Sequence, residues 1–414
     1  MISRETADSI DVYYQRKSSG VPNRQFIIFG ILGAILVGLG IILIIAHNWD
    51  NLGKGMKTFF AFLPLVLSQT LCGYVLLKRR ENVGWREVAG TFLFFAIGAS
   101  ISMVAQIYQI SGDLPAFLMT WMLLSIPVAY LMNSAVVSML CICGITYYVT
   151  TVGYSFSGSS KPWAYWGMLG LLFPFYYLLL RKNADSNFVR AHHWLLAGSV
   201  IIALGCFGGT ISEFLFLAYM SLFGLFYQVG SIPAIKSKFA LNGYLILSIL
   251  GTLVLLLIMS FNFIWEYFLK TNFTSNDLLT SSSFYLAVIL SVITPALFLF
   301  LYKEETFGQL SPFSYAWAVF LVVFVIGMFS PVAVVLVNVM VLLLGLYIMQ
   351  QGNVNNHLGL LNFGLLIIAT LVTCRFFDTD LSFVIRGLLF ISVGLGFFLA
   401  NYWLLKKRKA HEIR

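Results

Sequence analysis

The stretch RFFDTDLSFVIRG, Arg375 to Gly387, carries two arginines and two aspartates between two strongly apolar segments. A guanidinium group binds carboxylates and phosphates through paired hydrogen bonds, and an aspartate can serve as an acid or a base. The four charged residues are therefore candidates for holding an anionic substrate group: Arg375, Asp378, Asp380 and Arg386. An ion pair that only stabilises this connection is the simpler interpretation, because an arginine just inside a membrane span is costly without a partner.

Two further stretches, HNWDN and QIYQISGDLP, place polar side chains beside apolar segments. Gln106 and Gln109 are three residues apart, so a continuous helix would put both on one face. We include the polar and aromatic members of these stretches among the candidate substrate-binding residues: Trp49, Asp50, Gln106, Tyr108, Gln109 and Asp113.

Other signs of chemistry are weak. Cys141 and Cys143 would lie about 200° apart on a helix, so they could not bind one metal ion from that helix. His192 and His193 have no ligand residue at helical spacing and suit an interfacial anchor. The sequence contains no phosphate-binding glycine loop and no nucleophile elbow. We therefore predict no metal ion and no cofactor, and we assign no catalytic residue.

Composition determines the class of protein that must position these residues. Of 414 residues, 60% are hydrophobic and only 10% are charged, and the mean hydropathy is +0.90. A soluble domain is about 25% charged and could not bury this much apolar surface. The sequence therefore predicts an integral membrane protein, an all-α bundle of transmembrane helices with the lipid bilayer as its surroundings.

About 20 apolar residues are needed for one helical crossing. Single segments of this kind occur at 26–46, 58–77, 88–110, 163–180, 241–262, 283–302, 357–374 and 382–404. The tracts 115–152, 193–230 and 313–349 are too long for one crossing. We expect them to break at Asn133-Ser134, between Gly208 and Glu213, and at Ser330-Pro331, because these residues favour turns or helix starts. The prediction is about fourteen spans.

The distribution of basic residues predicts the orientation. With an even number of spans and a cytoplasmic N-terminus, six of the 25 lysines and arginines face outward: Lys54, Lys57, Lys161, Lys270, Arg375 and Arg386. This bias agrees with the positive-inside rule and places both termini in the cytoplasm. The expected organisation is a cytoplasmic tail at 1–24 with room for a short amphipathic helix, a helical membrane domain at 25–405, and a basic cytoplasmic tail at 406–414.

The net charge of +9 does not indicate a nucleic-acid-binding protein. The lysines and arginines are scattered over short loops and form no basic stripe with exposed aromatic residues. Attraction to anionic lipid headgroups and control of topology explain them. We expect no nucleic-acid partner, and the sequence leaves the oligomeric state open.

Three stretches resemble a bacterial family of membrane proteins known as domain of unknown function 2157. They begin GLGIILIIAHNWDNLGKGMK, AQIYQISGDLPAFLMTWM and NFGLLIIATLVTCRFFDTDLSF, at Gly38, Ala105 and Asn362. The resemblance implies a multi-pass protein of the bacterial inner (cytoplasmic) membrane, and it brings no activity with it. All three stretches place their polar residues on the predicted outward side, which suggests one shared site.

Three functions remain open. A transporter or flippase-like protein for a polar or lipid-linked substrate is favoured, because many spans occur without a long polar loop. The most central polar residues, Gln69, Thr294 and Asn338, cannot carry a proton, so coupling through an intramembrane acid is not expected. The alternatives are a non-catalytic assembly or regulatory membrane protein, and a membrane enzyme that acts on lipid headgroups at the outer interface.

Overall fold

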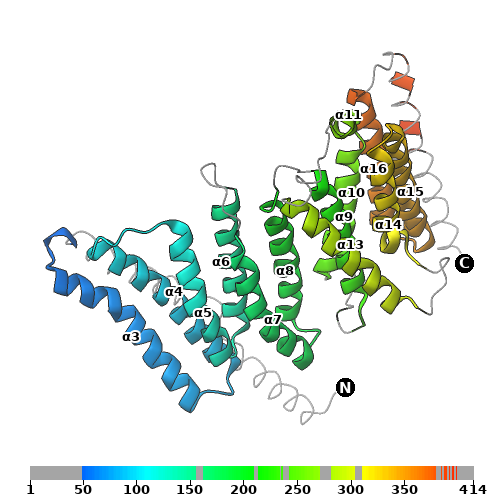
Figure 1. Cartoon of the computed structure of the whole chain (residues 1–414). Helices are drawn as coiled ribbons and strands as arrows, with labels where there is room; N and C mark the ends of the chain where they lie inside the picture. Colours follow the sequence, from blue (N-terminus) through cyan, green and yellow to red (C-terminus); the bar gives the residue numbers. More distant parts are fainter. Residues whose placement is uncertain are drawn as a thin grey trace, which may run out of the picture. The chain divides into compact units, whose positions relative to one another are not determined.

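The computed structural model describes residues 49–154, 162–208, 213–233, 235, 242–270, 281–303 and 310–378, with seven isolated positions between 384 and 398. These residues form helices and no strand. After a short 3-10 helix, η1 (Trp49–Asn51), the helices are α3 (Lys54–Lys78), α4 (Val83–Ile107), α5 (Leu114–Leu131), α6 (Ala135–Gly153), α7 (Ala164–Lys182), α8 (Asn187–Gly205), α9 (Glu213–Ser231), α10 (Gly243–Met259), α11 (Asn262–Lys270), α13 (Ser282–Leu301), α14 (Pro312–Gly327), α15 (Val332–Val354) and α16 (Leu358–Asp378) (Figure 1).

The expected all-helical membrane architecture is confirmed in this part of the chain. Each predicted segment from 58–77 to 357–374 coincides with a helix, and nine of the described helices are long and apolar enough to cross a membrane. The helices α10 and α14 are apolar but shorter than the nine. The helix α7 is long enough, but its tyrosines and terminal cations lower its mean hydropathy. The first and last predicted spans and both predicted tails lie outside the continuously described residues. The total of about fourteen spans therefore stays a prediction.

The three long tracts divide at the predicted places. The first divides between Leu131 and Ala135, and the second between Gly205 and Glu213. The third divides between Gly327 and Val332, with Pro331 directly before the new helix. The structure confirms these breaks. They occur there because each contains residues that favour turns or cannot continue a helix.

The helix α11 follows the predicted span 241–262, and the sequence predicts no further helix before the span at 283–302. Its Trp265 is fully buried and donates a hydrogen bond from Nε1 to the carbonyl oxygen of Met259 over 2.7 Å. The indole ring lies so close to Gly327 that a Cβ atom there would come within 1.8 Å of it. Nine residues are too few to cross a bilayer, so a sequence pattern of about 20 apolar residues does not predict this helix.

The described residues divide into two compact units, the first containing 49–67 and 99–111 and the second the remainder. In the first unit, the Ser100 hydroxyl donates a hydrogen bond of 2.8 Å to the carbonyl oxygen of Ala61, which joins α4 to α3. In the second unit, α9 packs against α10, α13 and α14, and α15 packs against α16 (Figure 1). The helices α5, α7 and α8 pack around α6.

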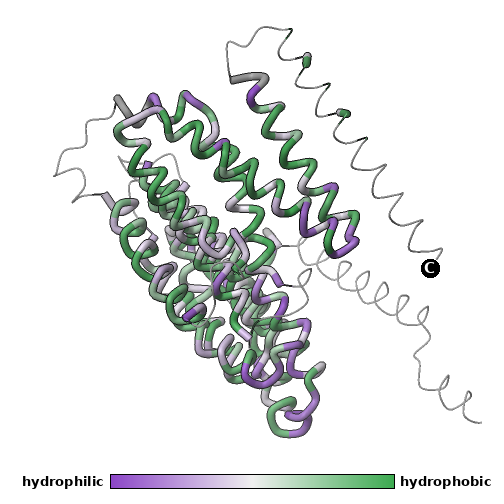
Figure 2. Tube along the Cα trace, turned by 90° about the vertical axis from the view of Figure 1, so that its right-hand side faces the viewer, coloured by the Kyte–Doolittle hydropathy of each residue, from purple (hydrophilic) through white to green (hydrophobic). Residues whose placement is uncertain are grey.

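Small polar residues join the helices of the second unit. Thr294 donates to the Ser221 carbonyl oxygen over 2.9 Å, and Ser248 donates to the Phe223 carbonyl oxygen over 2.7 Å. Such bonds are useful between membrane helices, because lipid tails supply no competing donor or acceptor. Figure 2 shows hydrophobic residues along the middle of the helices and hydrophilic residues gathered toward helix ends. Thr294 thus serves in packing and is fully buried.

The predicted orientation can be tested by cysteine labelling. In a variant without the five native cysteines, single cysteines at Ser159 and Lys407 are expected to react with a membrane-impermeant thiol reagent from opposite sides. The assay uses intact cells for outside labelling and inverted vesicles for inside labelling. Reaction of both positions from outside would contradict the odd number of spans predicted between Ser159 and Lys407.

Candidate functional site

The first unit contains the candidate residues Trp49, Asp50, Gln106, Tyr108 and Gln109. The Lys57 ammonium lies over the Trp49 ring at 5.6 Å from its centroid, and the hydroxyl groups of Tyr108 and Thr58 share a hydrogen bond of 3.1 Å. Trp49 and Tyr108 therefore both contact the first turns of α3. The backbone of Asp50 lies in η1, and its side chain is outside the described residues.

Gln106 and Gln109 do not share a helical face, so that prediction is wrong. The helix α4 ends at Ile107, and Gln109 adopts the left-handed conformation with φ 53°. The Ile110 amide donates to the Ala105 carbonyl oxygen over 2.9 Å and the Gln109 amide donates to Gln106, which is the Schellman arrangement that ends helices. Asn133 and Asn356 occupy the same position after α5 and α15. Here a glutamine takes the place usually held by glycine or asparagine, so the sequence did not reveal the helix end.

Asp113 lies in the second unit and caps α5. Its carboxylate accepts a hydrogen bond of 2.8 Å from the Ala116 amide, which satisfies a backbone donor of the first helical turn. The carboxylate also faces the positive end of the helix dipole. This contact gives Asp113 a structural role, and it remains exposed to other partners.

Arg375 binds residues far from it in the sequence. Its guanidinium donates a hydrogen bond of 3.1 Å to the Ser260 hydroxyl and lies over the Phe261 ring at 5.1 Å from the centroid. Ser260 ends α10, and its carbonyl oxygen also accepts a bond of 3.2 Å from the Asn338 side chain in α15. Arg375 thus connects the end of α16 to the end of α10, where a side chain from α15 also bonds.

The charged stretch begins inside a helix rather than in the expected connection. The helix α16 continues to Asp378, so Arg375 lies in its last turn, where a cation complements the negative end of the helix dipole. Phe376 and Phe377 offer no turn residue that would end the helix earlier. The Asp378 side chain, Asp380 and Arg386 are outside the described residues, so the pairing of an arginine with an aspartate stays a prediction.

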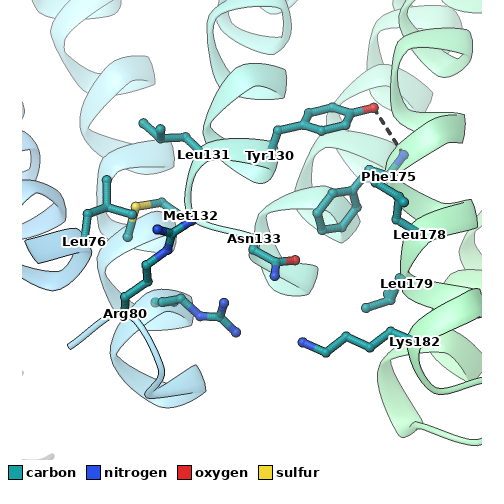
Figure 3. A pocket seen from close by; sticks show the side chains of 11 residues that line it. Leu76, Arg80, Tyr130, Leu131, Met132, Asn133, Phe175, Leu178, Leu179 and Lys182 are labelled. Atoms are coloured by element: carbon teal, nitrogen blue, oxygen red, sulfur yellow. Dashed lines mark hydrogen bonds between the residues drawn. The ribbon is translucent and has the colours of Figure 1, made fainter.

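The structure also contains a basic pocket that the sequence analysis did not single out. The α3–α4 connection contributes Arg80, and the first turn of α4 contributes Arg86. The α5–α6 turn contributes Asn133, and the end of α7 contributes Lys182. Figure 3 shows Arg80 and Lys182 on opposite sides of Asn133. The pocket has a volume of about 430 Å³, and its other lining residues are apolar or aromatic: Leu76, Tyr130, Leu131, Met132, Phe175, Leu178 and Leu179.

Among the described residues, no acidic side chain neutralises the three cations of this pocket. Within the described part of the chain, Arg80, Arg86 and Lys182 form no ion pair. The Nε atom of Arg86 is buried and has no hydrogen-bond partner among these residues. Like charges in one pocket repel, and a buried donor without an acceptor is costly. An anion in the pocket would reduce the repulsion and accept hydrogen bonds from the guanidinium groups.

Glu87, which follows Arg86 in the sequence, holds the pocket wall in place. Its two oxygens accept hydrogen bonds from the amides of Ala135 and Val136, at 2.9 and 3.0 Å, and from the Ser134 hydroxyl. Ser134 in turn accepts a bond of 3.2 Å from the Val137 amide. Together, Glu87 and Ser134 satisfy the first three amides of α6, which no helical carbonyl could reach. This contact attaches the α5–α6 turn to α4.

One signal in the sequence could have indicated the pocket. Arg80, Arg86 and Lys182 were all assigned to the inner ends of spans, and Asn133 to an inner turn. From the sequence alone, topology and attraction to lipid headgroups are sufficient to explain these cations. Only the packing of α3, α4, α5 and α7 shows that these separate segments line one cavity.

Comparison with protein families supports part of the resemblance noted above. Residues 1–138 match a family model described as predicted membrane protein (DUF2157). The DUF2157 match contains two of the three stretches that suggested the resemblance, and the stretch beginning at Asn362 lies beyond it. It also contains Arg80, Arg86 and Asn133, whereas the α7 wall with Lys182 follows it. No curated protein and no solved structure matches the chain.

Proposed function

We propose that this membrane protein is a transporter or flippase-like protein that moves a polar or lipid-linked substrate across the bilayer. The observation that carries the proposal is the basic pocket, in which Arg80, Arg86 and Lys182 lack acidic partners among the described residues. Phosphate groups suit such a pocket, because guanidinium groups bind phosphate oxygens with two parallel hydrogen bonds. The substrate would therefore carry a phosphate or a similar anion.

The predicted orientation gives this proposal a direction. The pocket lies at helix ends that the distribution of basic residues assigns to the cytoplasm, so we propose that the substrate binds there first. The polar residues Trp49 and Tyr108, at predicted outer ends of the spans, would receive the substrate on the other side. Binding on both sides with comparable strength suits transport, since a ligand held tightly in only one state would not be released.

The proposal is tested in liposomes that contain the purified protein. We expect the protein to accelerate the transfer of a fluorescent lipid-linked sugar phosphate or of a soluble sugar phosphate between the two sides. The triple variant Arg80→Ala, Arg86→Ala, Lys182→Ala is expected to lose at least tenfold of that acceleration, because it removes every cation of the pocket.

Two neighbouring cations provide a matched control. Arg79 and Arg181 are exposed, adjoin the pocket residues in sequence, and do not line the pocket. The double variant Arg79→Ala, Arg181→Ala should transfer substrate at the wild-type rate. Equal transfer of both probes with and without the wild-type protein would reject transport and favour a non-catalytic assembly or regulatory role.

A further inference from the structure

An apolar crevice lies between α5 and α7. Its volume is about 950 Å³, and it is lined by Leu123, Ile126, Pro127, Val128, Tyr130, Leu131, Gly170, Leu171 and Pro174. Tyr130 and Leu131 line both the crevice and the basic pocket. The two spaces are therefore neighbours along the same pair of helices, one apolar and the other cationic.

Tyr130 joins the two helices at this boundary. Its hydroxyl accepts a hydrogen bond of 3.2 Å from the Phe175 amide (Figure 3). The same hydroxyl donates a hydrogen bond to the Leu171 carbonyl oxygen. In a regular helix that amide and that carbonyl bond to each other. The tyrosine thus binds α7 at the turn where Pro174 has no amide hydrogen and disturbs regular helical bonding.

The two prolines and Gly170 shape the crevice. Pro127 in α5 and Pro174 in α7 both line it, and each removes one backbone bond from its helix. Gly170 has no side chain, and a Cβ atom built there would meet no atom within 4 Å. A cavity with this apolar lining takes a hydrocarbon chain in preference to a polar ligand.

From this juxtaposition we infer that the ligand of the basic pocket is a lipid phosphate, with its anionic headgroup between Arg80, Arg86 and Lys182 and one hydrocarbon chain in the α5–α7 crevice. The inference rests on the proposed function, because it names the substrate class for the same pocket. It explains why cationic and apolar linings meet at Tyr130 and Leu131. A free phosphate would use only the cationic half.

The test uses phosphatidic acid that carries a photoactivatable group in one chain, with the full-length protein in phosphatidylcholine nanodiscs. After irradiation, mass spectrometry measures labelling of the α5 and α7 peptides. We expect at least fivefold more labelling than with an uncharged diacylglycerol probe. Gly170→Trp should remove this excess by filling the crevice, and Arg86→Ala with Lys182→Ala should remove it by discharging the pocket.

Matched variants separate these effects from misfolding. Gly167 lies one turn earlier in α7, also has no atom within 4 Å of a built Cβ, and does not line the crevice. Gly167→Trp and Arg79→Ala should keep the excess labelling. Equal labelling by the diacylglycerol probe, or full labelling of Gly170→Trp, would overturn the inference. So would displacement of the probe by glycerol phosphate as readily as by phosphatidic acid.

The result is distinguishable from a failure of the proposed function. If the labelling pattern is as expected but liposomes show no transfer, the lipid site stands and transport does not. If transfer occurs while Gly170→Trp leaves both labelling and transfer unchanged, transport stands and the lipid site does not.

Discussion

Glu87→Ala is expected to destabilise the protein by about 3–5 kcal/mol. Hydrogen bonds to a charged group contribute about 1.5–3 kcal/mol each, and the three bonds of Glu87 together contribute less than their full sum because its side chain is only partly buried. The substitution removes the acceptor of the Ala135 and Val136 amides and of the fully buried Ser134 hydroxyl. These donors begin α6 and have no helical partner. Thermal unfolding of the purified protein in detergent measures the change.

Two variants control for the loss of a carboxylate. Glu81 is exposed in the α3–α4 connection, so Glu81→Ala should unfold at nearly the wild-type temperature. Glu87→Gln keeps one oxygen acceptor and loses the charge, so it should fall between wild type and Glu87→Ala. If Glu87→Ala and Glu81→Ala unfold at the same temperature, the carboxylate does not hold the start of α6.

Gly364→Ala is expected to destabilise the protein by about 1–3 kcal/mol, the usual cost of overpacking. A Cβ atom at Gly364 in α16 would lie 2.7 Å from the Met349 amide nitrogen and 2.8 Å from the Gly345 carbonyl oxygen, both in α15. These atoms belong to the backbone and cannot move without separating the two helices. Close approach of this kind is how small residues pack membrane helices. Thermal unfolding in detergent again gives the measurement.

Substituting alanine for a glycine elsewhere should change the stability in the opposite direction. Gly198 lies within α8, and a Cβ atom there would meet nothing within 4 Å. Gly198→Ala should therefore stabilise the protein by up to about 1 kcal/mol, the difference in helix propensity. A stabilising effect of Gly364→Ala as well would show that α15 and α16 do not approach each other so closely.

The sequence by itself predicted the class of protein, the helices and most of their breaks. Apolar length determines these features, because a backbone in lipid must satisfy its hydrogen bonds within each helix. The breaks at Asn133-Ser134 and Ser330-Pro331 were visible because asparagine and proline have strong local preferences. The end of α4 at Ile107 was missed, since Gln109 adopts a conformation that its residue type does not announce.

Only the tertiary structure decided which of these residues meet. Arg375 contacts Ser260, which lies 115 residues earlier, and Glu87 caps a helix 48 residues later. The basic pocket likewise gathers Arg80, Asn133 and Lys182 from three separate segments of the chain, and the α5–α7 crevice adjoins it at Tyr130. No local pattern encodes such contacts. They depend on how side-chain volumes, glycines and interhelical hydrogen bonds fit whole helices together, which is a property of the packed bundle and not of any one segment.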